Sequence, residues 1–243
     1  MDVTLKSGLG PGSKQGVEAL IDYLYGAQRT SLRPADHTDA NNAQLGFYSA
    51  AVPTGAMVSI GAGGILASLC WTDQSRLLVL LGIKAAFAVN AAITAATKLD
   101  VGAYVSRGGS AQATGGTAVV LTSNNNKMRS RMGTSLIASG EFRVASASAI
   151  TRGTSGAVDA NAFALSPFAL KVSPDIGATA ATGLALGVAT PLVELYRWDP
   201  TKHPLILEPG NRETIELQHV AAGPVTGSYT GYFTFEWAEL SSF

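Results

Sequence analysis

Hydrophobic and polar residues alternate along much of the chain with a period of two. A pleated strand imposes this spacing when one of its faces is buried and the other is exposed. The pattern is clearest over residues 228–239, where the odd positions from Tyr229 to Trp237 are aromatic or glycine, whereas Thr230, Thr234 and Glu236 point the other way. The sequence therefore predicts a long strand here with one face in a sheet core.

Similar short segments, separated by Gly, Pro, Asn and Ser, continue through most of the chain. They predict strands at 45–51, 57–60, 66–71, 77–89, 98–107, 118–121, 135–138, 143–147, 191–198, 205–207, 214–219 and 228–239. Many short strands with turn residues between them are typical of an all-β sandwich or barrel. The segment 77–89 is apolar on both faces, which favours a central strand covered on both sides.

One helix is predicted near the N-terminus. Ser13 is a suitable N-cap, and apolar residues recur from Val17 to Leu24 at the spacing of one helical face. We expect this short helix over about residues 14–27, ending near Gly26.

A polar, turn-rich stretch over 30–42 shows no periodicity, and we place a boundary at its end. The predicted organisation is an N-terminal arm with a short helix and linker over 1–42, followed by a β-sandwich domain over 43–243. The Ala/Gly/Ser/Thr-rich stretches 153–162 and 173–187 are predicted to be long loops that make contacts, since long loops without such a role are uncommon in compact domains.

The composition is poor in charge. Charged residues make up 14% of the chain, against about 25% in an ordinary soluble domain. Hydrophobic residues make up 47% and the mean hydropathy is +0.21. Because a free monomer needs charged surface to stay apart from its copies, we expect a homo-oligomer that covers part of its surface with neighbours.

The net charge bears on the choice of partner. Seventeen basic and seventeen acidic residues cancel, so the chain has no overall field to attract nucleic acid or an anionic membrane. The most apolar run, 77–83, stops at Lys84 and is too short for a membrane helix. The first residues lack the pattern of a signal peptide, and the single cysteine, Cys70, fits a reducing cytoplasm.

Candidate metal and nucleophile residues are sparse. His37 lies between Asp36 and Asp39, but this spacing is typical of a solvated turn, and His203 and His219 have no such neighbours. Three scattered histidines and one cysteine give no basis for a catalytic triad. We therefore predict no metal and no cofactor, and we assign no catalytic residue.

Two further motifs have simple structural explanations. The glycines of 61–64 resemble a phosphate-binding loop only in part, because Leu66 replaces the third glycine of that motif, and we expect a turn between strands. The basic residues Lys127, Arg129 and Arg131 alternate as one exposed strand face would, and we expect them to contact solvent or another subunit rather than phosphate.

Several carboxylates and aromatic residues are candidates for hydrolysing or binding carbohydrate. Paired carboxylates would be sought among Glu208, Glu213, Glu216, Glu236 and Glu239, and sugar-stacking rings among Tyr196, Trp198 and Tyr229. Proximity in sequence does not supply the opposed geometry that hydrolysis needs. Aromatic residues at strand spacing belong more often to a core.

The C-terminal part of the chain resembles the closing strands of jelly-roll proteins from tailed-phage particles, over residues 203–212, 214–218 and 227–237. The segment 31–51 and the Ala/Gly/Thr-rich composition also resemble phage virion proteins. This resemblance implies an all-β, jelly-roll-like antiparallel β-sandwich. It implies a non-enzymatic component of a bacteriophage virion, assembled in the host cytoplasm, and carries over no functional residues.

We expect a self-associating viral structural protein, either a capsid decoration or cementing protein or a minor head protein. Its partners would be itself and other virion proteins such as the major capsid protein, and a trimer or a pentamer would suit the symmetry of a particle. Two alternatives remain open: a tail or fibre-base component, and a carbohydrate (receptor) binding module on the same fold.

Overall fold

The computed structural model describes residues 20–21, 28–29, 46–91, 93, 97–122, 126–128, 130, 132–154, 156–170, 189–199 and 201–240. The chain divides into two units, Met1–Ala35 and Asp36–Phe243. Throughout these described residues the regular structure consists of strands, without a helix. The predicted all-β class is confirmed.

The first unit contains a small antiparallel ladder. Strand β1 (Leu20–Ile21) pairs with β2 (Gln28–Arg29). The helix predicted over 14–27 is therefore wrong at Leu20–Ile21, and its other residues lie outside the described part. A short isolated helix gains little from its own hydrogen bonds, so four apolar positions at helical spacing do not suffice to form one. The predicted boundary between 42 and 43 also lies outside the described residues and stays a prediction.

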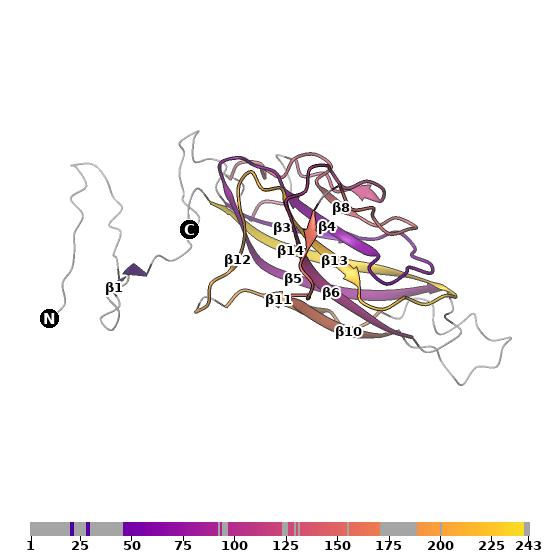
Figure 1. Ribbon diagram of the computed structural model, residues 1–243. Helices are drawn as coiled ribbons and strands as arrows, with labels where there is room; N and C mark the ends of the chain where they lie inside the picture. Colours follow the sequence, from indigo (N-terminus) through magenta and orange to yellow (C-terminus); the bar gives the residue numbers. More distant parts are fainter. Residues whose placement is uncertain are drawn as a thin grey trace, which may run out of the picture. The chain divides into compact units, whose positions relative to one another are not determined.

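The second unit is a sandwich of two antiparallel sheets (Figure 1). The five-stranded sheet has the order β11-β5-β14-β3, and β12 also pairs with β5. Its strands are β3 (Gly46–Pro53), β5 (Leu77–Ala91), β11 (Val193–Arg197), β12 (Leu205–Leu207) and β14 (Ser228–Leu240).

The seven-stranded sheet has the order β10-β6-β13-β4-β8-β7, and β9 also pairs with β6. Its strands are β4 (Ile65–Trp71), β6 (Thr97–Arg107), β7 (Thr117–Ala118), β8 (Phe142–Val144), β9 (Ala157–Val158), β10 (Ala164–Leu170) and β13 (Glu213–His219).

The main strands pair in a nested order. The outermost pair in sequence is β3 with β14, followed by β4 with β13, β5 with β11, and β6 with β10. Two further pairings, β14 with β5 and β13 with β6, join these pairs within the two sheets. Four nested strand pairs that fold over into two packed sheets form the jelly-roll arrangement.

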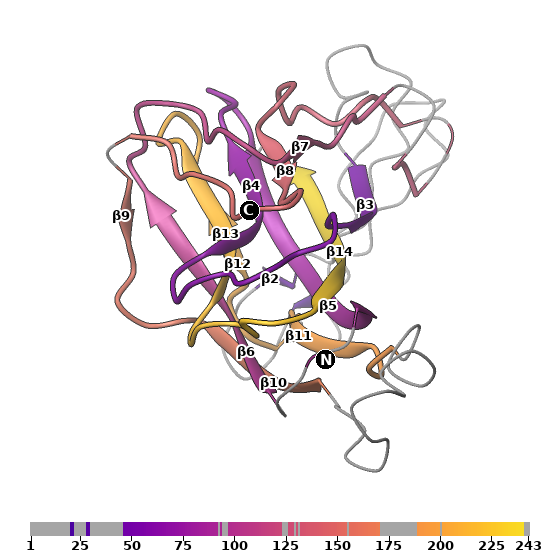
Figure 2. The ribbon, with the colours of Figure 1, turned by 90° about the vertical axis from the view of Figure 1, so that its right-hand side faces the viewer.

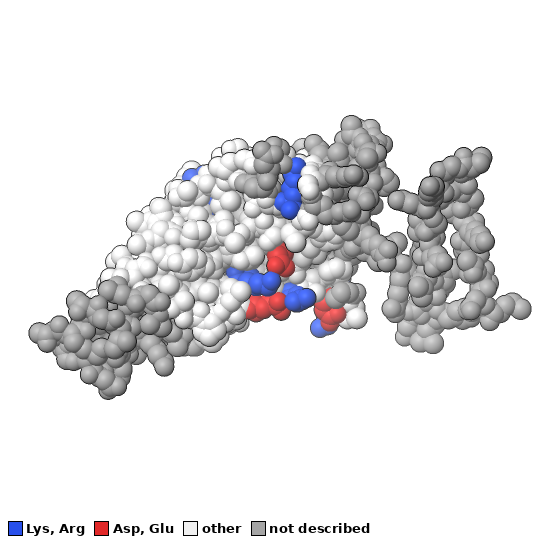
Figure 3. Space-filling model, turned by 180° about the vertical axis from the view of Figure 1, so that it is seen from behind, with Lys and Arg blue, Asp and Glu red and all other residues white. Residues whose placement is uncertain are grey.

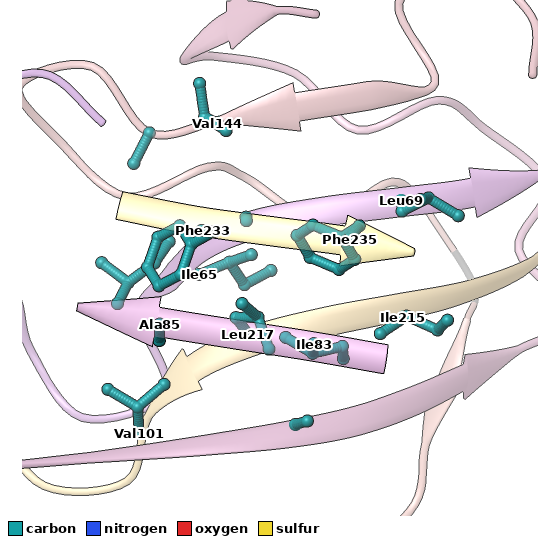
Figure 4. Close-up of a cluster of buried hydrophobic side chains, with 14 of the residues drawn as sticks. Ile65, Leu69, Ile83, Ala85, Val101, Val144, Ile215, Leu217, Phe233 and Phe235 are labelled. Atoms are coloured by element: carbon teal, nitrogen blue, oxygen red, sulfur yellow. The ribbon is translucent and has the colours of Figure 1, made fainter. Parts of the chain in front are cut away.

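The core lies between the two sheets. Figure 4 shows Phe233 and Phe235 of β14 close to Ile215 and Leu217 of β13, and all four are at most 1% exposed. The aromatic rings interlock: Phe142 meets Phe235 edge-on at 5.2 Å between ring centroids, a geometry that aromatic pairs favour. Alternate residues of β14 are buried, as the sequence predicted.

Some predicted strands differ from the structure. Strand β10 was not predicted, because Pro167 interrupts its apolar run. It forms on the edge of its sheet, where proline is tolerated. The segment 57–60 contributes only the bridge between Met57 and Tyr229, and 135–138 forms no strand.

Candidate functional site

The strongest charged cluster lies on the seven-stranded sheet around Glu216 of β13. This carboxylate is 1% exposed and accepts hydrogen bonds from Arg152 Nε at 2.8 Å and Arg152 Nη2 at 2.7 Å. Gln218 Nε2 donates a third, also at 2.7 Å. The hydrogen bonds with Glu216 raise the pKa of the Arg152 guanidinium, and the two charges form a bidentate pair.

Glu213 lies at the start of β13 and is also buried. Arg107 of β6 donates to Glu213 Oε1 at 2.7 Å, and the backbone N–H of Glu208 donates to Glu213 Oε2 at 2.8 Å. Arg107 lies 3.8 Å from Asp159 as well, in a more exposed pair. The Glu213 carboxylate therefore closes the turn over 208–213, which contains Pro209 and Gly210.

A third buried carboxylate, Glu141, lies 3.1 Å from the guanidinium of Arg212. Cys70 is a buried free cysteine beside Thr214 and Glu141, and burial is the main reason that its pKa rises to about 12. A thiol with so high a pKa is protonated near neutrality, which argues against a nucleophile. Cys70 therefore serves as a small buried residue of β4.

Glu239 is fully buried near the end of β14. It accepts hydrogen bonds from Ser135 Oγ at 2.5 Å, Leu136 N–H at 2.9 Å and Trp237 Nε1 at 3.0 Å. These contacts attach the 133–138 segment to the sandwich. Burial raises the pKa of Glu239 to about 7, although each of these donors lowers it.

Glu236 lies on the outer face of the five-stranded sheet, as predicted. It pairs with Lys84 of the neighbouring strand β5 at 2.8 Å, and both side chains are partly exposed. The five candidate carboxylates thus lie in separate environments. The side chains of Glu213, Glu216 and Glu236 each have a different basic partner. Glu239 accepts from neutral donors, and Glu208 donates its backbone N–H to Glu213.

The histidines do not converge. His219, at the end of β13, is 1% exposed, and its Nε2 lies 2.7 Å from the Tyr229 hydroxyl. His203 is exposed, while Asp36, His37 and Asp39 lie outside the described residues. Within the described part of the chain, no group of three or more His, Cys, Asp or Glu side chains is arranged to hold a metal ion.

The aromatic residues that were candidates for sugar binding are buried or make contacts within the chain. Tyr229 is buried, and the Trp198 indole N–H donates to the Lys202 carbonyl at 2.8 Å. Tyr196 packs edge-on against Phe163 with ring centroids 5.4 Å apart. Together they provide no shared exposed platform.

The predicted basic face is described only at Lys127, since Arg129 and Arg131 lie outside the described residues. Lys127 forms an isolated bridge to Tyr48. The hydrogen bonds from Ser49 N–H to the Asn126 carbonyl and from Met128 N–H to the Phe47 carbonyl flank this bridge. The 126–128 segment therefore covers part of the edge of β3, which limits pairing with another chain there.

Two loops lie side by side at one end of the sandwich (Figure 2). Loop 54–64 joins β3 to β4, and loop 220–227 joins β13 to β14. Ser59 N–H donates to the Pro224 carbonyl at 3.2 Å, and Gly223 N–H donates to the Ile60 carbonyl at 2.8 Å. The glycines of 61–64 form the predicted turn, in which Gly63 has a φ of 73°.

These two loops contain no charged residue. They carry three exposed aliphatic side chains, Val58 at 49%, Val220 at 41% and Val225 at 77% exposure. On the face shown in Figure 3, blue and red side chains gather in adjacent groups, and a wide part of the described surface is white. The structure thus combines buried ion pairs on one sheet with a pair of uncharged loops, 54–64 and 220–227, which we name the valine end after Val58, Val220 and Val225.

The sequence had no means of identifying either feature. Arg152 and Glu216 are 64 positions apart, and Arg107 and Glu213 are 106 apart, so only the pairing of strands brings them together. The only hint of the valine end was the lack of charge in both loops.

Comparison with known proteins gives no relative: no family model matches the chain, and no curated protein or solved structure is similar to it. Among the described residues, no helix has the length and hydrophobicity to span a membrane.

Proposed function

We propose that this protein is a non-enzymatic structural component of a phage particle that associates with its own copies and with neighbouring virion proteins. Within the particle, the favoured role is capsid decoration or cementing, or that of a minor head protein. The support for the phage assignment is the resemblance of the C-terminal strands, together with a jelly-roll strand order that this resemblance implied.

The observation that carries the proposal is how the molecule uses its few charges. Several carboxylates are buried, and their contacts hold loops to the sheets: Glu141, Glu213, Glu216 and Glu239. Only 14% of the residues are charged, and the burial of these carboxylates leaves still fewer charges on the surface. A surface with so little charge favours association over a dispersed monomer.

The buried ion pairs also suit a structural role. Each of Glu213 and Glu216 meets its own guanidinium at 2.7 Å, so both carboxylates are already engaged in contacts within the chain. The aromatic residues weighed for sugar binding are buried or already bonded, which leaves the carbohydrate-binding alternative without a specific observation in its favour.

Light scattering coupled to size-exclusion chromatography tests self-association. We expect a mass that is a fixed multiple of 25.0 kDa and that persists over a hundredfold dilution. Mass spectrometry of purified particles should find the protein among the virion components. A monomer at every concentration that is also absent from particles would contradict the proposal.

A further inference from the structure

We propose that copies of this chain contact one another through the valine end, formed by loops 54–64 and 220–227. This inference rests on the proposed function, from which it takes the self-association of the chain. It adds the surface through which the copies associate. The occupant of the surface is a second copy of the same chain.

The first argument is the exposure of aliphatic side chains on loops that are already held in place. Val225 is 77% exposed and Val58 is 49% exposed, and both follow or precede backbone hydrogen bonds between the loops. Met57 and Tyr229 form a further bridge below them, and Gly63 N–H donates to the His219 carbonyl at 2.7 Å. A surface ordered in advance loses little conformational entropy on binding.

The second argument concerns charge and selects the occupant. In a symmetric assembly, equivalent residues approach one another around the rotation axis, so any charge near the axis meets its own sign. Like charges brought together at an interface cost several kcal/mol. Neither loop carries a charge, so the valine end can face a second valine end without this repulsion.

The neighbouring strand does not change this conclusion. Asp100 of β6 lies beside the valine end, because its carbonyl accepts the Val220 N–H at 2.9 Å, but its side chain is half-buried. A partner recognised by complementary charge would find its counterpart elsewhere on the molecule, for example at the exposed pairs Glu194–Arg197 and Asp199–Lys202. The chemistry of the valine end therefore fits another copy of itself.

The double variant V58D/V225D tests the inference by placing carboxylates at the contact. We expect its dissociation constant for self-association to rise at least about 100-fold, measured by light scattering or sedimentation over a dilution series. The matched control is V120D, since Val120 is 68% exposed and lies outside both loops. We expect the control to assemble as the wild type does.

A second measurement covers the case in which the double variant folds poorly. In V225C, the introduced thiols of two copies should form an intermolecular disulfide under mild oxidation, whereas V120C should not, and the native Cys70 is buried. An assembled V58D/V225D protein, or equal crosslinking of V225C and V120C, would overturn this inference alone. A wild-type protein that is a monomer at every concentration and is absent from particles would overturn the proposed function as well.

Discussion

At the scale of single residues, two buried titratable side chains link stability to pH in opposite directions. Burial lowers the pKa of His219 to about 4 and raises that of Glu239 to about 7. Both effects arise because the charged form loses hydration inside the sandwich. His219 also has the Tyr229 hydroxyl within 2.7 Å, and Glu239 has three donors, so neither can move away from its buried position without breaking hydrogen bonds.

The sign of each effect follows from proton linkage. The unfolded chain takes up a proton on His219 below its ordinary pKa of 6.5, which the folded chain does only near 4, so stability falls as the pH drops from 6.5 to 4. Glu239 in the unfolded chain releases its proton near 4.5 and in the folded chain near 7, so stability falls as the pH rises between these values. Each contribution is about 3 kcal/mol.

We predict that E239Q and H219Q change the pH profile in opposite ways. Relative to the wild type, the stability of E239Q should increase as the pH rises from 4.5 to 7, and that of H219Q should decrease as the pH rises from 4 to 6.5. Urea denaturation at a series of pH values measures both profiles. Parallel profiles for the wild type and both variants would contradict the burial of the two charges.

At the scale of elements, the buried ion pairs connect loops to the seven-stranded sheet. Arg152 follows the isolated bridge at Thr151 and reaches Glu216 on β13. A pair of this kind adds little net stability compared with an apolar pair, but removing one member leaves an uncompensated charge in the interior. Arg152 therefore attaches the long connection between β6 and β10 to the seven-stranded sheet.

We predict that R152A destabilises the fold by about 3 kcal/mol, because Glu216 is then left with Gln218 as its remaining side-chain donor. The double variant R152A/E216Q should recover part of this loss, since no buried charge remains. Chemical denaturation gives both values. If the double variant is less stable than R152A by the full cost of a second independent substitution, the two residues do not form a coupled pair.

At the scale of the whole molecule, the described core is a single cluster that joins the two sheets. The buried hydrophobic cluster extends from Tyr48 to Trp237 and draws on both sheets. The described core cluster therefore lies within residues 48–237, inside the second unit, Asp36–Phe243.

We predict that deletion of residues 1–35 leaves the unfolding free energy of the remaining chain within about 0.5 kcal/mol of the full-length value. The comparison is best made by urea denaturation at a protein concentration at which both forms have the same oligomeric state. Loss of cooperative unfolding in the shortened chain would show that the first unit is part of the folded core.

Self-association through uncharged surface also has a characteristic response to salt. We predict that the dissociation constant changes less than about threefold between 0.05 and 1 M sodium chloride, because screening acts on charges and the valine end has none. Sedimentation at several salt concentrations measures this. A steep weakening with salt would point to an interface held by the surface ion pairs instead.

The extent of prediction from the sequence differed between these scales. Alternation along β14 and β13 was sufficient to predict strands and their buried faces, because side-chain direction in a strand depends only on position parity. The sequence did not predict β10, since Pro167 is compatible with a strand only at a sheet edge, and edge position is a property of the assembled sheet. The helix predicted over 14–27 from a local pattern of four apolar residues is wrong at Leu20–Ile21, and its other residues lie outside the described part of the chain.

The sequence by itself determined that this chain is an all-β protein with an apolar interior and an unusually small number of charges. Local periodicity and composition carry that information directly. The tertiary structure decided which charges are buried, as in the pairing of Arg152 with Glu216, and which uncharged loops become neighbours at the valine end. Both depend on strand pairing between residues tens to hundreds of positions apart, and that pairing is set by the free energy of the whole core.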